Sequence, residues 1–116
     1  MEDSRIKRIN SEIQKVINET INHKLKDPRV SKDAIISVTS VDTAKDLSIT
    51  KVYISIFNVE DEKEVMQGIE SATGFIKNEL AAKLDLRHTP DIKFIKDEGA
   101  KQADKIDRIL KNLKSE

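Results

Sequence analysis

The chain has no cysteine and no tryptophan among its 116 residues. Without thiols it cannot form disulfide bonds, thiolate metal sites or a cysteine nucleophile, and this composition suits the cytoplasm, where we expect the protein to be. Three phenylalanines and one tyrosine are also too few to line an aromatic ligand cavity. These absences favour a binding protein over an enzyme.

Long apolar runs are missing as well. No stretch approaches the roughly 20 apolar residues that a membrane-spanning helix needs. The first residues, Met1-Glu2-Asp3-Ser4, are acidic and lead into an amphipathic pattern, which is not typical of a secretory signal. We therefore expect a protein that makes no membrane contact.

The net charge is zero, because 21 basic residues balance 21 acidic ones. The charges are nevertheless unevenly distributed: residues 4–32 have five more basic than acidic residues, and residues 58–72 have four more acidic than basic ones. This distribution predicts a polarised molecule that could orient itself on a phosphate backbone. The alternative is that each run is only the solvated face of a helix.

The apolar periodicity predicts a helix over about residues 4–26, which Pro28 ends because proline disfavours helical backbone at the preceding residue. Residues rich in β-branching then predict strands over 34–41 and 48–58, with a hairpin at 41–47. On the second strand the core face carries Val52, Ile54 and Ile56, and the opposite face carries Tyr53 and Phe57.

The second half of the chain predicts a helix over 62–72 capped by Asp61, a kink, a helix over 75–84 and a short strand over 92–96. A last helix follows, with an apolar stripe over 103–113. Because two helices connect the second strand to the third, those strands should be parallel. The expected fold is α+β, with helices on one face of a three-stranded mixed sheet. We expect one domain over 4–113, with frayed ends at 1–3 and 114–116.

Gly74 lies inside a helical pattern, where glycine costs roughly 1 kcal/mol relative to alanine. We interpret Ala72-Thr73-Gly74 as a sharp kink at which Gly74 adopts backbone angles, or permits a close approach, that a Cβ would forbid. The alternative is that Gly74 only lets another element of the fold pack closely.

Catalytic motifs are weak. His23 and Asp27 are four residues apart, but two ligands do not make a metal site. His88 follows Arg87 in an expected loop and could contact phosphate, a base or nothing. The three glycines are too dispersed for a phosphate-binding loop. A small hydrolase using His23 or His88 is therefore a minor hypothesis, and no cofactor or metal is expected.

Five segments occur in the order found in one family. They are Asp27-Pro28-Arg29, Val41 to Leu47 leading into Val52-Tyr53-Ile54-Ser55, Ala72-Thr73-Gly74, Leu86-Arg87-His88-Thr89-Pro90, and Phe94-Ile95-Lys96-Asp97 before a helix ending Ile106-Asp107-Arg108-Ile109-Leu110. Together, from about Ser4 to Leu113, they strongly resemble ribosome-binding factor A.

The resemblance implies a type II KH-like domain in which Ala72-Thr73-Gly74 replaces the usual glycine loop. It further implies a non-enzymatic assembly factor for the small (30S) ribosomal subunit, supporting late maturation and 5′-end processing of 16S rRNA, notably in the cold. Ribosomal proteins or an assembly GTPase are possible partners. We expect a monomer.

The expected contacts are with RNA phosphates, and Gly74 would let an RNA backbone approach the start of the following helix. The candidate RNA-binding residues are Arg5, Lys7, Arg8, Arg29, Lys45, Lys77, Lys83 and Arg87. The competing hypothesis is a protein-interaction module that uses the acidic region 58–72 or the outer face of the second strand.

Overall fold

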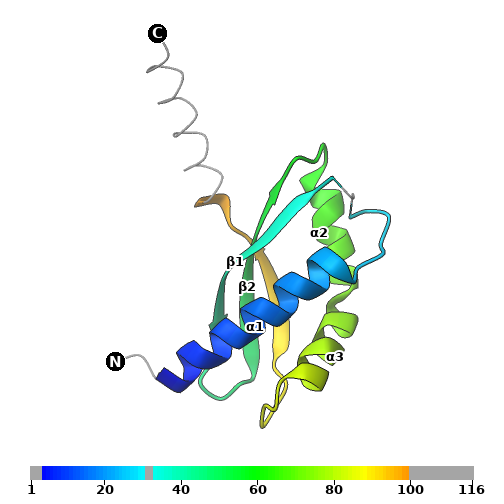
Figure 1. Cartoon of the computed structure of the whole chain (residues 1–116). Coiled ribbons are helices and arrows are strands. Elements are labelled where there is room, and N and C mark those ends of the chain that lie inside the picture. The colour runs from blue at the N-terminus through cyan, green and yellow to red at the C-terminus, as the bar shows by residue number, and fades with distance from the viewer. Residues whose placement is uncertain (1–3, 31–32, 100–116) are drawn as a thin grey trace.

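The computed structural model describes residues 4–30 and 33–99. The elements follow the predicted order, and their bounds are α1 (Ser4–His23), β1 (Ile35–Thr43), β2 (Ile49–Phe57), α2 (Glu62–Ser71), α3 (Thr73–Lys83) and β3 (Asp91–Lys96). The three helices lie on one face of a three-stranded sheet (Figure 1), which confirms the α+β fold. The expected last helix, over 103–113, lies outside the described residues.

The sheet has the order β1-β2-β3, with β1 antiparallel and β3 parallel to the central strand. The parallel pairing confirms the crossover that was predicted from the two intervening helices. Core residues face each other across the sheet, since Val38 pairs with Ile54 and Val52 pairs with Phe94.

The core lies between the sheet and the helices. Ile54 of β2 and Ile17 of α1 are fully buried, as are Ile76 and Leu80 of α3. Burying one such side chain contributes roughly 1.5–3 kcal/mol to folding. The predicted core face of β2 is confirmed, whereas the opposite face is only partly open because Tyr53 and Phe57 are half-buried.

A row of amides on α1 covers the outer edge of β1. The Val38 N–H donates to Asn18 Oδ1 at 3.1 Å, and Gln14 Nε2 donates to Val38 O at 2.9 Å. One helical turn further toward the N-terminus, the Thr43 N–H donates to Asn10 Oδ1 at 3.0 Å. The amides satisfy backbone groups that an edge strand would otherwise expose to other chains.

Several element ends differ from prediction by a few residues. Helix α1 ends at His23 because the N–H groups of Lys24 and Leu25 both donate to Thr20 O, so the regular ladder stops there. Strand β1 continues to Thr43, which shortens the hairpin connection to residues 44–48. The predicted Asp61 cap of α2 is confirmed, since its carboxylate accepts from the N–H groups of Lys63 and Glu64.

The break between α2 and α3 is confirmed at Ala72, but the interpretation of Gly74 within the fold is wrong. The φ of Gly74 is not positive, and a Cβ placed there would have nothing within 4 Å. The glycine that packs tightly is Gly68 of α2, where a Cβ would lie 2.9 Å from Val30 Cγ2 and 3.3 Å from Arg29 Cβ. Gly68 therefore lets α2 lie against the turn that follows α1.

Among residues 4–30 and 33–99, none of the helices combines the length and apolar character needed to cross a lipid bilayer.

Candidate nucleic-acid interface

Three segments that are distant in sequence meet at one end of the molecule. They are the first turns of α1, the β1–β2 turn and the α3–β3 loop, which lie together at the bottom of Figure 1. They bring together four of the eight predicted RNA-binding residues and one histidine. We call this group the basic end: Arg5, Arg8, Lys45, Arg87 and His88.

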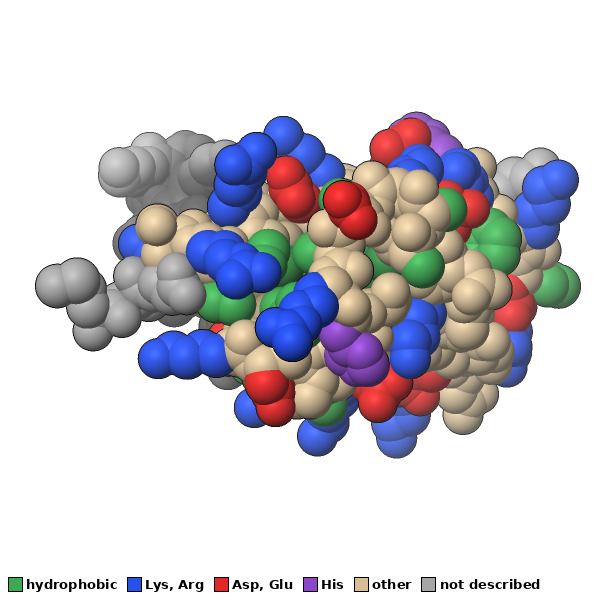
Figure 2. Space-filling model, turned by 90° about the horizontal axis from the view of Figure 1, so that it is seen from below, with side chains coloured by type: hydrophobic (Ala, Val, Ile, Leu, Met, Phe, Trp, Pro, Cys, Tyr) green, Lys and Arg blue, Asp and Glu red, His purple; other side chains and the backbone are tan. Residues whose placement is uncertain are grey.

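A hollow of about 500 Å³ opens within the basic end. Its rim carries Arg5, Lys45, Asp46, Arg87 and His88, and its apolar floor consists of Ile6, Ile9 and Leu47. A smaller hollow of about 190 Å³ adjoins it and is also lined by Arg8. Figure 2 views the molecule from below, and blue lysine and arginine side chains surround green apolar ones on its left half.

The β1–β2 turn positions the floor and the rim of this hollow. The Leu47 N–H donates to Ala44 O at 2.9 Å, and the Ser48 N–H donates to Asp46 Oδ1 at 3.0 Å. The contact with Ser48 lowers the pKa of Asp46, so this carboxylate is charged at neutral pH. Leu47 is buried with a φ of 63°, an unusual conformation for a bulky residue.

Lys77 and Arg29 lie outside the basic end and are paired with acidic residues. Lys77 Nζ lies 2.8 Å from Asp91 Oδ1 and thereby lowers the pKa of Asp91. Arg29 forms two hydrogen bonds with the carboxylate of Asp27, at 2.7 and 3.0 Å. This fork holds the pKa of Asp27 at about 2.

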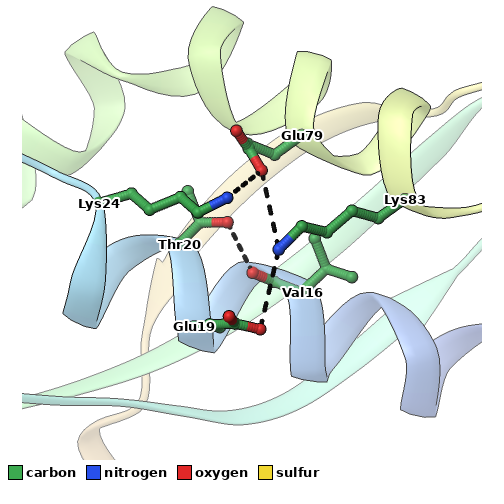
Figure 3. A network of polar contacts seen from close by, with 6 residues as sticks. All are labelled: Val16, Glu19, Thr20, Lys24, Glu79 and Lys83. Carbon is green, nitrogen blue, oxygen red and sulfur yellow. Dashed lines mark hydrogen bonds and ion pairs between the residues drawn. The ribbon is translucent and has the colours of Figure 1, made fainter.

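Lys83 belongs to a network between α1 and α3 (Figure 3). Lys24 Nζ lies 2.8 Å from Glu79 Oε2, and Lys83 Nζ lies 3.9 Å from the same oxygen and 3.8 Å from Glu19 Oε2. The hydrogen bond with Glu79 raises the pKa of Lys24 and lowers that of Glu79. The network joins two helices, so the position of Lys83 suits packing as well as RNA binding.

In contrast, neither Lys45 nor Arg87 forms an ion pair within residues 4–30 and 33–99. Arg8 is paired only loosely, because its Nε lies 3.6 Å from Glu12 Oε1 and its side chain is 83% exposed. Lys7 is exposed on the first turns of α1 and lines neither hollow.

The kink lies at the other end of α3 from Arg87. Gly74 is exposed, and Phe75 beside it leaves 45% of its surface in solvent. Thr73 Oγ1 donates to Glu70 O at 2.6 Å, which ties the start of α3 to the end of α2. The kink is therefore an open surface that a ligand backbone could approach.

Four acidic residues, Asp33, Glu60, Asp61 and Glu64, gather at the opposite end of the sheet, where β2 ends. Together with Pro28, Arg29, Asn58, Val59 and Val65, they line a hollow of about 620 Å³. The predicted polarity is thus present, although the basic run 4–32 is split. Arg5 lies in the first turn of α1, at the basic end, whereas Arg29 follows the C-terminal end of the helix, next to the acidic hollow.

The two histidines do not share a site. His23 ends α1, and His88 lies in the α3–β3 loop at the basic end. Within the described part of the chain, no group of three histidine, aspartate or glutamate side chains could hold a metal ion.

A family model described as ribosome-binding factor A matches residues 5–110. The chain belongs to the ribosome-binding factor A family. A family member from Finegoldia magna, called ribosome-binding factor A, is 39% identical over 117 residues, covering 100% of this chain and 96% of that protein.

Solved structures of ribosome-binding factor A proteins have the same fold. A Thermotoga maritima protein described as a putative ribosome binding factor A is 33% identical, with a TM-score of 0.68 over 82% of this chain and 90% of that one. A homology model of Thermus thermophilus ribosome-binding factor A, fitted into a cryo-EM map of a complex with the 30S subunit, has a TM-score of 0.61 at 24% identity, over 74% of this chain and 88% of that one.

The sequence of this family member did not predict that the residues of the hollow's floor belong to a candidate site. Ile6 and Ile9 fall within the predicted amphipathic helix over 4–26, and Leu47 falls within the predicted hairpin at 41–47. The only local signal was Asp46 two residues before Ser48, a spacing that favours an aspartate-capped turn.

Proposed function

We propose that this chain is a non-enzymatic assembly factor that binds the 30S ribosomal subunit through 16S rRNA. Its site is the basic end, with phosphate contacts from Arg5, Arg8, Lys45 and Arg87. In this role it supports late maturation and 5′-end processing of 16S rRNA, notably in the cold. It acts in the cytoplasm as a monomer, alongside ribosomal proteins or an assembly GTPase.

The observation that carries this proposal is the convergence of cations from three separate segments around one hollow. Phosphate contacts dominate the affinity of most proteins for nucleic acids, and Lys45 and Arg87 have no ion pair within residues 4–30 and 33–99 to exchange for such contacts. Membership of the ribosome-binding factor A family supports the same partner.

The other predicted cations take secondary parts in this proposal. Lys7 extends the basic end along α1. Lys77, Lys83 and Arg29 would have to exchange an acidic partner for a phosphate, so each contributes less to binding than Arg87. The kink at Ala72-Thr73-Gly74 provides a second contact, where the small Gly74 admits an RNA backbone to the first turn of α3.

The direct test is co-sedimentation of the purified protein with small subunits, large subunits and joined ribosomes over a range of salt concentrations. We expect retention on free small subunits that falls as salt rises. The variants Lys45→Ala and Arg87→Ala should be retained less than the wild type. Lys63→Ala, which removes the same charge from the exposed surface of α2, serves as the matched control. Absence of retention at low salt would refute the proposal.

One observation favours a second candidate function. The acidic hollow formed by Asp33, Glu60, Asp61 and Glu64 fits a basic segment of a protein partner. If this surface rather than the basic end recruits the chain, binding should survive nuclease treatment of the partner and should be lost in Glu60→Gln/Glu64→Gln. Retention unaffected by these changes would exclude it.

A further inference from the structure

The hollow at the basic end has features that phosphate contacts alone do not require. Phosphates need cations or N–H groups, and these can lie on a flat surface. Here Arg5, Lys45 and Arg87 surround a recess whose floor is apolar, formed by Ile6 and Leu47 together with Ile9. An apolar floor beneath a cationic rim matches a ligand that is planar and apolar at one end and anionic at the other.

The floor depends on a strained residue. Leu47 has a φ of 63°, whereas its side chain is only 6% exposed. Glycine or asparagine would adopt this backbone conformation at lower cost. A leucine here turns the chain while placing an apolar side chain between the sheet and α1. Unusual backbone conformations cluster at functional sites, which makes this turn a candidate part of a binding site.

The rim offers groups suited to a nucleobase as well as to a phosphate. The Asp46 carboxylate lines the hollow, and its Oδ1 accepts the Ser48 N–H at 3.0 Å. A carboxylate has several acceptor positions, so it can also accept a hydrogen bond from an exocyclic amino group of a base. The His88 ring and the Arg87 guanidinium are planar groups on which an unstacked base can lie.

Resting on the proposed function, we propose that this hollow receives one unpaired RNA nucleotide. The base lies on Ile6 and Leu47, and the phosphate lies between Arg5, Lys45 and Arg87. A volume of about 500 Å³ is within the roughly 300–1,000 Å³ of small-ligand sites. Because a paired base is stacked within its helix, the site selects bulges, loops and single strands. It lies at the far end of α3 from the Gly74 kink.

The test compares three blunt-ended RNA duplexes with the same number of base pairs by fluorescence anisotropy at one salt concentration. One is fully paired, one carries a single-nucleotide bulge, and one carries an abasic nucleotide in that bulge. The wild-type protein should bind the bulged RNA about tenfold more tightly than either of the others, as expected for one buried and stacked base. Equal binding of the bulged and abasic RNAs, or no binding to any RNA at low salt, would overturn the inference.

Two variants locate the effect in this hollow. Leu47→Asn retains every charge and suits the turn, and Ile6→Ser changes a partly buried floor residue; both should lose the preference for the bulge. Lys45→Ala should weaken binding to all three RNAs alike. Preference retained in both floor variants, once circular dichroism shows that they are folded, would overturn the inference. Retention of the wild type on small subunits tests the proposed function separately, so its failure is distinguishable.

Discussion

Two glycines on consecutive helices differ in the space around them. Gly68 faces Val30 and Arg29, and a Cβ there would lie 2.9 Å from Val30 Cγ2, whereas Gly74 faces open space. The same substitution should therefore have opposite effects at the two positions, which gives a matched pair of variants.

We expect Gly68→Ala to destabilise the fold by roughly 1–3 kcal/mol, because it forces extra volume between α2 and the turn after α1. Gly74→Ala should leave stability unchanged or raise it by up to about 1 kcal/mol, because alanine favours a helix more than glycine does. Urea unfolding of both variants measures the difference. Equal destabilisation would show that Gly74 is constrained within the fold.

Gly74→Ala also separates folding from binding. If an RNA backbone approaches the start of α3, this variant should be as stable as the wild type and yet be retained less on small subunits. If its retention equals that of the wild type, the kink is not an RNA contact.

At the scale of elements, the turn after α1 is held by one carboxylate. Asp27 Oδ1 accepts the Arg29 N–H at 2.9 Å as well as the Arg29 side chain, and Asp27 O accepts the Val30 N–H. The hydrogen bonds from Arg29, its side chain first and then its backbone N–H, favour the charged carboxylate and lower the pKa of Asp27 from 3.8 to about 2. This turn also supports the tight packing of α2 at Gly68.

Because the folded-state pKa of Asp27 is depressed, its contribution to stability is present above about pH 4 and is lost as the pH falls toward 2. Asp27→Asn should therefore have a lower Tm than the wild type at pH 7, and the difference should shrink as the pH falls through this range. Asp85→Asn, which changes an exposed carboxylate in the α3–β3 loop, is the control. A difference in Tm that does not vary with pH would contradict the assignment.

The contact between α1 and α3 gives a second test at this scale. Lys83 lies between Glu79 and Glu19 (Figure 3). In contrast, Arg87 forms no ion pair within residues 4–30 and 33–99. We expect Lys83→Ala to lower Tm slightly and to change small-subunit retention little. Arg87→Ala should change Tm little and should lower small-subunit retention. Thermal melts and co-sedimentation of both variants decide this. Equal losses of retention would place Lys83 in the interface.

At the scale of the molecule, the basic end and the acidic hollow lie at opposite ends of strand β2. Strand β2, with nine residues, rises about 3.3 Å per residue and separates the β1–β2 turn from the acidic hollow. A zero net charge is thus compatible with nucleic-acid binding, because the basic end can face the phosphates while the acidic end points away.

The salt dependence of binding follows from this arrangement. With about four phosphate contacts, the slope of log K against log salt should be roughly −3 to −4. Arg87→Ala should make the slope shallower by about 1, and Lys63→Ala should leave it unchanged. Titrations of small subunits at several salt concentrations give the slope. A slope near zero in the wild type would contradict an interface based on phosphates.

The sequence predicted much of the fold because the relevant physics is local. Apolar spacing identified the helices and the core face of β2, Pro28 marked the end of α1 to within a few residues, and Asp61 was correctly predicted as a cap. The packing of Gly68 and the amide row on α1 were missed. Each depends on a neighbour from another element that no local pattern reveals.

The sequence by itself determined the order of the elements, the residues of the core and the supply of cations, since periodicity and backbone preferences act over a few residues. Only the tertiary structure decided which cations have acidic neighbours. Lys83 meets Glu19 because α1 packs on α3. Lys45 and Arg87 come close to the first turns of α1 because three segments meet at one end of the sheet. Coulomb interactions and hollows depend on distances in space, and those distances exist only after the elements have packed.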